Sequence, residues 1–182
     1  MNWLNNFLIL LAAFISVFFE AAFQGVRPLL ATQVDLLPAL MVYASLWGTR
    51  LTVPLLAVFG GLFYDSLSAN PLGITIVPLF LIGTGIQAYR DLILRDQLFA
   101  QITLGLVASL AAPLITLLLL LTTGHQPVAG WGTLWQLSVM ATAGAAAAPA
   151  WCLLFGLFNR IFVHQSAVQS SFRPDREIRR GR

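Results

Sequence analysis

Six apolar stretches, each compatible with a helix, follow one another along the chain and are separated by short polar or turn-forming segments. They cover residues 3–24, 36–47, 51–64, 72–88, 98–123 and 134–158. A helix that crosses a membrane needs about 20 apolar residues, so the second and third stretches are short for spans. The pattern predicts an all-α polytopic membrane protein, with a six-helix transmembrane bundle in residues 1–163. Residues 164–182 are predicted to form a disordered, arginine-rich cytoplasmic tail.

The third stretch combines a stripe of small residues with an acidic residue. Ala57, Gly60 and Gly61 recur at helical spacing, and Asp65 follows about one turn later. In a membrane, small residues at this spacing let a second helix approach closely. We therefore expect Ala57, Gly60 and Gly61 to form a helix-packing face that ends at the carboxylate.

Asp65 is followed by residues that cap, turn or break helices, including Ser68, Asn70 and Gly73, so the helix is predicted to end near Asp65. One role for Asp65 is to accept the backbone N–H groups of residues 66–68 and so cap this turn. The other role, which is compatible with the first, is to shape with Ser68, Asn70 and Gly73 an outer-face pocket or docking surface for a partner. On this hypothesis, Asp65→Asn leaves folding largely intact but weakens partner binding.

Two further acids lie at the ends of apolar stretches. Asp35 precedes the proline-containing second stretch, where it is predicted to be the N-cap, and it is a further candidate for the outer-face site. Glu20 lies near the end of the first stretch, and its side chain is expected to be satisfied locally or to reach outward.

The composition agrees with a membrane protein. The chain of 182 residues is 58% hydrophobic and 9% charged, with a mean hydropathy of +0.83, well outside the range of soluble domains. Lysine is absent, because all ten basic residues are arginines. This excludes phosphate-binding loops with a catalytic lysine and Schiff-base chemistry.

The position of the arginines predicts the orientation. If both termini are cytoplasmic, only Arg27 lies outside and the other nine arginines lie inside, as the positive-inside rule requires. The tail carries five arginines within the last ten residues. Beside a membrane helix, such a tail is expected to contact anionic lipid rather than nucleic acid.

The sequence contains no recognisable catalytic, cofactor or metal motif. His125 and His164 lie on opposite sides of the membrane in the predicted topology, and neither has a ligand partner at helical spacing. There is no G-x-S-x-G segment and no glycine-rich phosphate loop. We therefore expect no metal site, no cofactor and no enzymatic activity.

The order of three short motifs resembles a bacterial membrane-protein family. A D-L-L-P segment (35–38) opens one stretch, G-G-L-F-Y-D-S-L (60–67) closes the next, and P-L-G (71–73) opens another. This resembles the MreD family of rod shape-determining proteins, in which a G-x-x-x-D-x-x-S-x-x-x-L-G-like signature joins two adjacent spans. The matching residues here are Gly61, Asp65, Ser68, Leu72 and Gly73.

The resemblance implies a non-enzymatic scaffold of the bacterial cytoplasmic (inner) membrane, required for cell shape and lateral peptidoglycan synthesis. It also implies a fold like that of the substrate-binding subunits of energy-coupling-factor vitamin transporters. The implied direct partner is MreC. Through MreC the implied partners are the MreB filament, the RodA glycosyltransferase and its penicillin-binding transpeptidase. Because the scaffold family and the transporter subunits share a helical bundle, a vitamin or small-molecule transporter subunit is the alternative. The two functions must be distinguished by the residues of the site.

Overall fold

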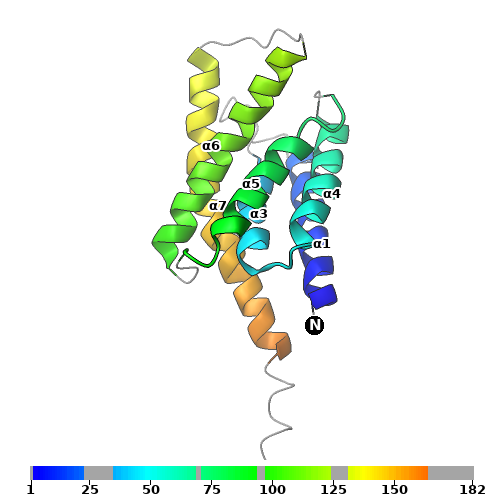
Figure 1. Ribbon diagram of the computed structural model, residues 1–182, viewed down its shortest axis with the longest axis vertical. Helices are drawn as coiled ribbons and strands as arrows, with labels where there is room; N and C mark the ends of the chain where they lie inside the picture. The colour runs from blue at the N-terminus through cyan, green and yellow to red at the C-terminus, as the bar shows by residue number, and fades with distance from the viewer. Residues whose placement is uncertain (1, 23–34, 69–70, 94–96, 124–130, 164–182) are drawn as a thin grey trace, which may run out of the picture. The chain divides into compact units, whose positions relative to one another are not determined.

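The computed structural model describes residues 2–22, 35–68, 71–93, 97–123 and 131–163, and all regular structure within them is helical. The helices are α1 (Asn2–Ala22), α3 (Leu37–Trp47), α4 (Thr52–Leu67), α5 (Ile76–Tyr89), α6 (Leu98–Thr122) and α7 (Trp131–Val163) (Figure 1). The predicted all-α fold with six helices is therefore confirmed for the part of the chain that the structure describes. The predicted tail, residues 164–182, lies outside it.

Three helices are long and apolar enough to cross a membrane. These segments are Asn5–Ala22 in α1, Leu98–Thr122 in α6 and Trp131–Phe158 in α7. The remaining helices, α3, α4 and α5, are apolar but have only 11, 16 and 14 residues. The helix lengths indicate a membrane protein in which three helices are long enough to cross a membrane and three are shorter.

The chain divides into two compact units, Met1–Trp151 and Cys152–Arg182, and the boundary falls within α7. In the second unit the described part is the C-terminal end of α7. This segment exposes Leu153, Leu154 and Leu157 and carries Arg160 in its last turn. The first unit contains all the features described below.

Helix α3 forms the core of the first unit. Every residue from Leu37 to Leu46 is buried, and α3 packs against α1, α4, α5 and α6 (Figure 1). A helix that is apolar on all sides can be buried on all sides, which explains why this short stretch lies in the interior. Val42 and Leu46 of α3 cluster with Ala108 of α6, and isoleucine and leucine side chains of the neighbouring segments pack around them.

Small residues let α6 and α7 approach within the first unit. A Cβ atom added to Gly105 of α6 would lie 2.4 Å from the carbonyl oxygen of Gly144 in α7 and 2.6 Å from the Cβ of Ala148. Real Cβ atoms do not come so close to backbone, so the crossing requires glycine at position 105. This arrangement matches the small-residue packing of membrane helices.

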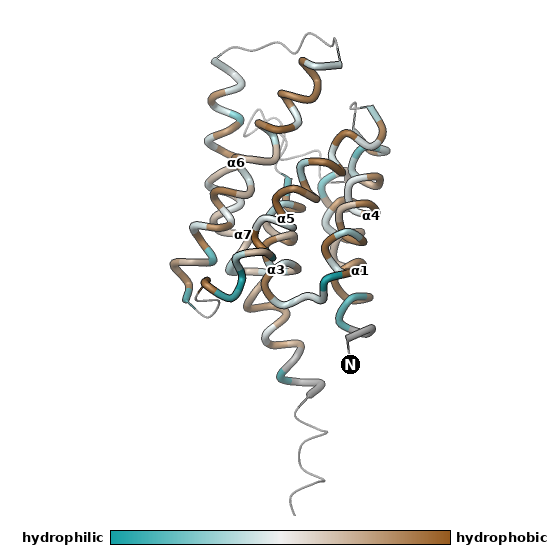
Figure 2. The backbone as a smooth tube through the Cα atoms, in the orientation of Figure 1, coloured by the Kyte–Doolittle hydropathy of each residue, from teal (hydrophilic) through white to brown (hydrophobic). Residues whose placement is uncertain are grey.

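Polar groups gather at helix ends, including the turn between α3 and α4 (Figure 2). There the hydroxyl of Thr52 donates to Oδ1 of Asn6 in α1 at 2.7 Å and accepts the Thr49 N–H at 2.9 Å. These bonds join the start of α1 to the α3–α4 turn. Arg50 lies in this turn, at the end of α3 opposite to Asp35.

Candidate functional site

Asp65 joins the end of α4 to the start of α5. Its side chain is only 2% exposed. Oδ2 accepts the backbone N–H groups of Gly73 at 2.8 Å and of Thr75 at 3.1 Å, and Oδ1 accepts the Thr75 hydroxyl. One buried carboxylate therefore satisfies three donors from the chain eight to ten residues later, which we call the Asp65 clasp.

The clasp corrects one expectation from the sequence. Asp65 was predicted to accept N–H groups of residues 66–68, but its donors are Gly73 and Thr75. The reason is that α4 continues to Leu67. The N–H groups of residues 66 and 67 are thus inside the helix and point toward its preceding turn.

Gly73 shapes the turn that the clasp holds. Its φ of +89° lies in the left-handed region that favours glycine. The Ile74 N–H donates to Pro71 O and the Ile76 N–H donates to Gly73 O, both at 3.3 Å. Because this turn occupies residues 71–75, α5 begins at Ile76, four residues later than the apolar stretch.

The small residues of α4 lie on its buried face with Tyr64 and Asp65. A Cβ atom on Gly61 would lie 3.0 Å from the backbone nitrogen of Ile76, and one on Gly60 would lie 3.3 Å from Cδ2 of Leu37. Gly61 therefore brings α4 against the first residue of α5, directly beside the clasp. Ala57 is fully buried on the same face.

The other predicted site residues lie at different positions around this turn. Ser68 is the C-cap residue of α4, and its hydroxyl is 3.5 Å from the Asp65 carbonyl oxygen. Leu72 is 73% exposed. Asn70 lies outside the described residues, as do His125 and His164.

Asp35 lies at the start of α3, in the connection that precedes the helix. The N-cap position is Leu36, so the prediction of Asp35 as N-cap is wrong by one residue. The carboxylate nevertheless accepts the N–H of Leu37, the first helical residue, at 2.9 Å. Glu20 of α1 accepts the Leu36 N–H at 2.7 Å. Two acids thus satisfy donors at the start of α3.

The environment of Asp35 disfavours its negative charge. Burial raises the pKa of the Asp35 carboxyl from 3.8 to about 7; the hydrogen bond from Leu37 lowers the pKa, and the nearby charge of Asp65 raises it. The side chain is 9% exposed. Asp35 therefore titrates near neutral pH, whereas an ordinary aspartate is ionised there.

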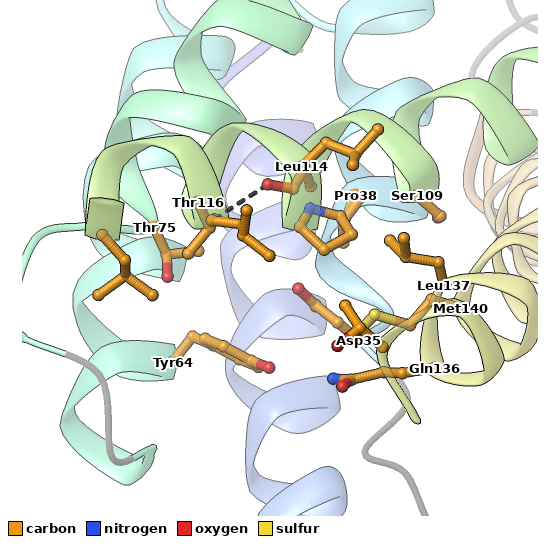
Figure 3. A pocket seen from close by; sticks show the side chains of 15 residues that line it. Asp35, Pro38, Tyr64, Thr75, Ser109, Leu114, Thr116, Gln136, Leu137 and Met140 are labelled. Atoms are coloured by element: carbon orange, nitrogen blue, oxygen red, sulfur yellow. Dashed lines mark hydrogen bonds between the residues drawn. The ribbon is translucent and has the colours of Figure 1, made fainter. Parts of the chain in front are cut away.

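A cavity of about 200 Å³ opens beside Asp35. Its wall comes from the start of α3, the end of α4, Thr75, the middle of α6 and the first part of α7 (Figure 3). Tyr64 and Gln136 direct their polar ends to the same side of the cavity as Asp35, while Leu137 and Met140 supply apolar surface. The arrangement of a few polar groups on an apolar wall is typical of small-molecule sites.

Sequence reasoning brought Asp35, Asp65 and Gly73 into one site but missed Thr75, Tyr64 and the α7 side chains. Thr75 lies inside a stretch that the sequence predicts to be helical, so the sequence does not indicate that Thr75 donates hydrogen bonds to Asp65. Gln136 and Met140 lie in α7, far from Asp35 along the chain, and only the tertiary arrangement brings them to Asp35. Helical spacing within α7, which places positions 133, 136, 137 and 140 on one face, is the signal that marks them as a set.

The opposite end of α3 has a basic surface. A hollow there is lined by Arg50, Thr84, Gln87 and Arg90, together with Ala88 and Asp91. The Gln87 side chain donates to the Thr49 carbonyl oxygen at 3.2 Å. Carboxylates therefore gather near the start of α3, and arginines gather near its end.

The metal-ligating side chains in the described segments form no cluster of three that could hold a metal ion. Comparison of the chain with protein families, with curated proteins and with solved structures finds no match.

Proposed function

We propose that this chain is a non-enzymatic scaffold of the bacterial cytoplasmic membrane that assembles the cell-elongation complex, as the resemblance to the MreD family implies. It binds MreC directly and, through MreC, the MreB filament, RodA and the penicillin-binding transpeptidase. In this way it supports cell shape and lateral peptidoglycan synthesis. The proposal includes a bundle like that of energy-coupling-factor substrate-binding subunits.

The observation that carries this proposal is the Asp65 clasp. Three of the five residues that match the family signature, Gly61, Asp65 and Gly73, meet at the α4–α5 junction. A signature that joins two spans has a physical reason in this arrangement, because glycine at 61 and 73 and a carboxylate at 65 are each required by the local geometry. Asp65 is then a positioning residue, since it is buried and its oxygens are engaged inside the protein.

The surface offered to a partner is the exposed edge of the turn. Leu67, the last residue of α4, is 55% exposed, and Leu72, directly before Gly73, is 73% exposed. Helices associate in membranes through close packing and a few polar contacts, so a rigid turn at the membrane surface is a suitable docking point. We propose that MreC contacts this edge.

The distribution of charge supports an orientation with both termini in the cytoplasm. Arg50 and Arg90 lie near the end of α3, and Asn6, close to the N-terminus, bonds to the same turn. Arginine-rich ends of membrane proteins face the cytoplasm. The clasp and the cavity are then on the outer side, and the tail contacts anionic lipid on the inner side.

Co-purification of MreC with the tagged full-length protein tests the proposal. Leu72→Glu should reduce the amount of MreC recovered at least tenfold, because a charge replaces an exposed apolar contact. Leu92→Glu is the matched control, since Leu92 is 81% exposed in the turn after α5. Equal recovery of MreC with both variants and the unchanged protein would contradict the docking surface.

The cavity beside Asp35 supports a second candidate, the substrate-binding subunit of a vitamin or small-molecule transporter. Depletion of the protein in its host separates the two functions. Rounded or widened cells that the intact gene restores would support the scaffold. Normal cell shape with a growth defect that a vitamin cures would support the transporter subunit instead.

A further inference from the structure

The cavity beside Asp35 has room for an organic ligand. Its volume of about 200 Å³ corresponds to roughly six or seven water molecules at the density of the liquid. Sites for drug-sized ligands are larger, at about 300 Å³ or more. The space therefore accommodates a small organic molecule.

Among the residues that the structure describes, Asp35 is the only charged side chain in the lining of the cavity, and no arginine contributes to it. Within the described residues, Oδ1 of Asp35 accepts the Leu37 N–H and the second oxygen accepts no hydrogen bond. The nearby Asp65 interacts with Asp35 electrostatically and adds negative potential. The site is thus suited to a positively charged hydrogen-bond donor.

The remaining walls distinguish an organic cation from a metal ion. The described residues contain no cluster of three metal-ligating side chains, and a metal ion gains nothing from apolar walls. Leu114, Leu137 and Met140 supply apolar surface to the lining. Such surface stabilises the carbon skeleton of a ligand by removing it from water.

We propose that this cavity binds a small organic ammonium compound, with its N–H groups held by the carboxylate of Asp35 and its carbon atoms packed on Leu137 and Met140. The Gln136 amide, which points to the same region, supplies a further acceptor. The ligand must carry a primary or secondary ammonium group on a short apolar body. The inference rests on the cavity and does not depend on the scaffold function.

The titration of Asp35 gives the site a pH dependence. Because burial raises the pKa of Asp35 to about 7, a neutral solution contains both protonation states, and only the ionised one attracts an ammonium ion. Affinity should therefore be highest above pH 7 and fall about tenfold for each pH unit below it. Among the described residues, Glu20 of α1 and Asp65 of α4 are the other acids that interact electrostatically with this carboxylate.

Calorimetric titration of the purified full-length protein in detergent tests the proposal, with n-butylammonium as the probe and butan-1-ol as its neutral counterpart. At pH 8 we expect n-butylammonium to bind at least tenfold more tightly than butan-1-ol. Asp35→Asn should weaken n-butylammonium at least tenfold and abolish the pH dependence. Asp91→Asn makes the same chemical change at an exposed position outside the cavity and should leave binding unchanged.

Several results would overturn the proposal. These are absence of n-butylammonium binding at pH 8, equal affinity for butan-1-ol, or unchanged affinity in Asp35→Asn. The asparagine can still accept the Leu37 N–H, so this variant should fold. If it does not, the comparison of pH 8 with pH 6 on the unchanged protein decides, since affinity that stays constant over this range excludes the ionised Asp35 as the binding group. Recovery of MreC in the co-purification described above is read separately, so either proposal can fail alone.

Discussion

Asp65 and Thr75, ten residues apart, are joined by two hydrogen bonds, because the carboxylate accepts both the backbone N–H and the hydroxyl of the threonine. Both residues are buried, at 2% and 4% exposure. Inside a protein, a hydrogen bond to a charged group contributes about 1.5–3 kcal/mol, and an unpaired donor costs a similar amount. The pair therefore fixes the α4–α5 junction through polar contacts within an apolar bundle.

Of three substitutions in the Asp65 clasp, Asp65→Ala should lower the free energy of unfolding most. Asp65→Ala leaves the Gly73 N–H, the Thr75 N–H and the Thr75 hydroxyl without an acceptor, and we expect a loss of roughly 3 kcal/mol or more in the free energy of unfolding. Asp65→Asn should cost only about 1 kcal/mol. The amide oxygen of the asparagine can accept the two N–H groups, and the Thr75 hydroxyl can rotate to accept a hydrogen bond from the amide NH₂ group. Thr75→Val should cost roughly 1–2 kcal/mol.

Chemical unfolding in mild detergent measures these differences. Thr84→Val is the control for Thr75→Val, because the Thr84 hydroxyl bonds to the Phe80 carbonyl oxygen of its own helix and its loss should change stability by less than about 0.5 kcal/mol. Equal effects of the two threonine substitutions would show that the Asp65 clasp contributes no specific stability.

The contact between Gly61 and Ile76 predicts a second difference. Gly61→Ala places a Cβ atom 3.0 Å from the backbone nitrogen and 3.1 Å from the Cα of Ile76, so α4 and α5 must separate, at a cost of roughly 1–3 kcal/mol. Gly85→Ala is the matched substitution in α5, where an added Cβ meets nothing within 4 Å. There alanine should stabilise the helix by up to about 1 kcal/mol. A Gly61→Ala protein as stable as Gly85→Ala would refute this contact.

The helices follow from the sequence, whereas the clasp does not. Long apolar stretches in a chain with few charges leave an α-helical membrane protein as the simplest fold, because every backbone polar group must bond within its own segment. The recurrence of Ala57, Gly60 and Gly61 also indicates the face of α4 on which the structure buries them. The partner of Asp65 depends on the conformation of the turn, which Gly73 sets through a positive φ that sequence spacing does not encode.

The role of α3 shows a second limit of sequence reasoning. The sequence predicts its stretch to be one of six spans, although a short one, yet its 11 residues are buried almost throughout by four other helices. An apolar run of 10–14 residues is more typical of a buried helix or a re-entrant segment than of a membrane span. The choice between these depends on the neighbours of α3, and these come from distant parts of the chain.

The buried position of Asp35 predicts how stability changes with pH. Because burial raises the pKa of this carboxyl from 3.8 to about 7, the folded protein holds a proton between about pH 4 and pH 7 that the unfolded chain has released. The contribution of Asp35 to the free energy of unfolding should therefore fall as the pH rises through this window, by up to about 1.4 kcal/mol per unit, and level off above pH 7. Asp35→Asn should remove this contribution and make the profile shallower within this window, whereas Asp91→Asn, at an exposed position, should leave the profile unchanged. Glu20 and Asp65 remain in all three proteins, so the difference between the unfolding profiles reports Asp35 together with its electrostatic effect on Glu20. Chemical unfolding at intervals of half a pH unit measures it, and parallel profiles for the unchanged and Asp35→Asn proteins would show that Asp35 is ionised in the folded state throughout this range.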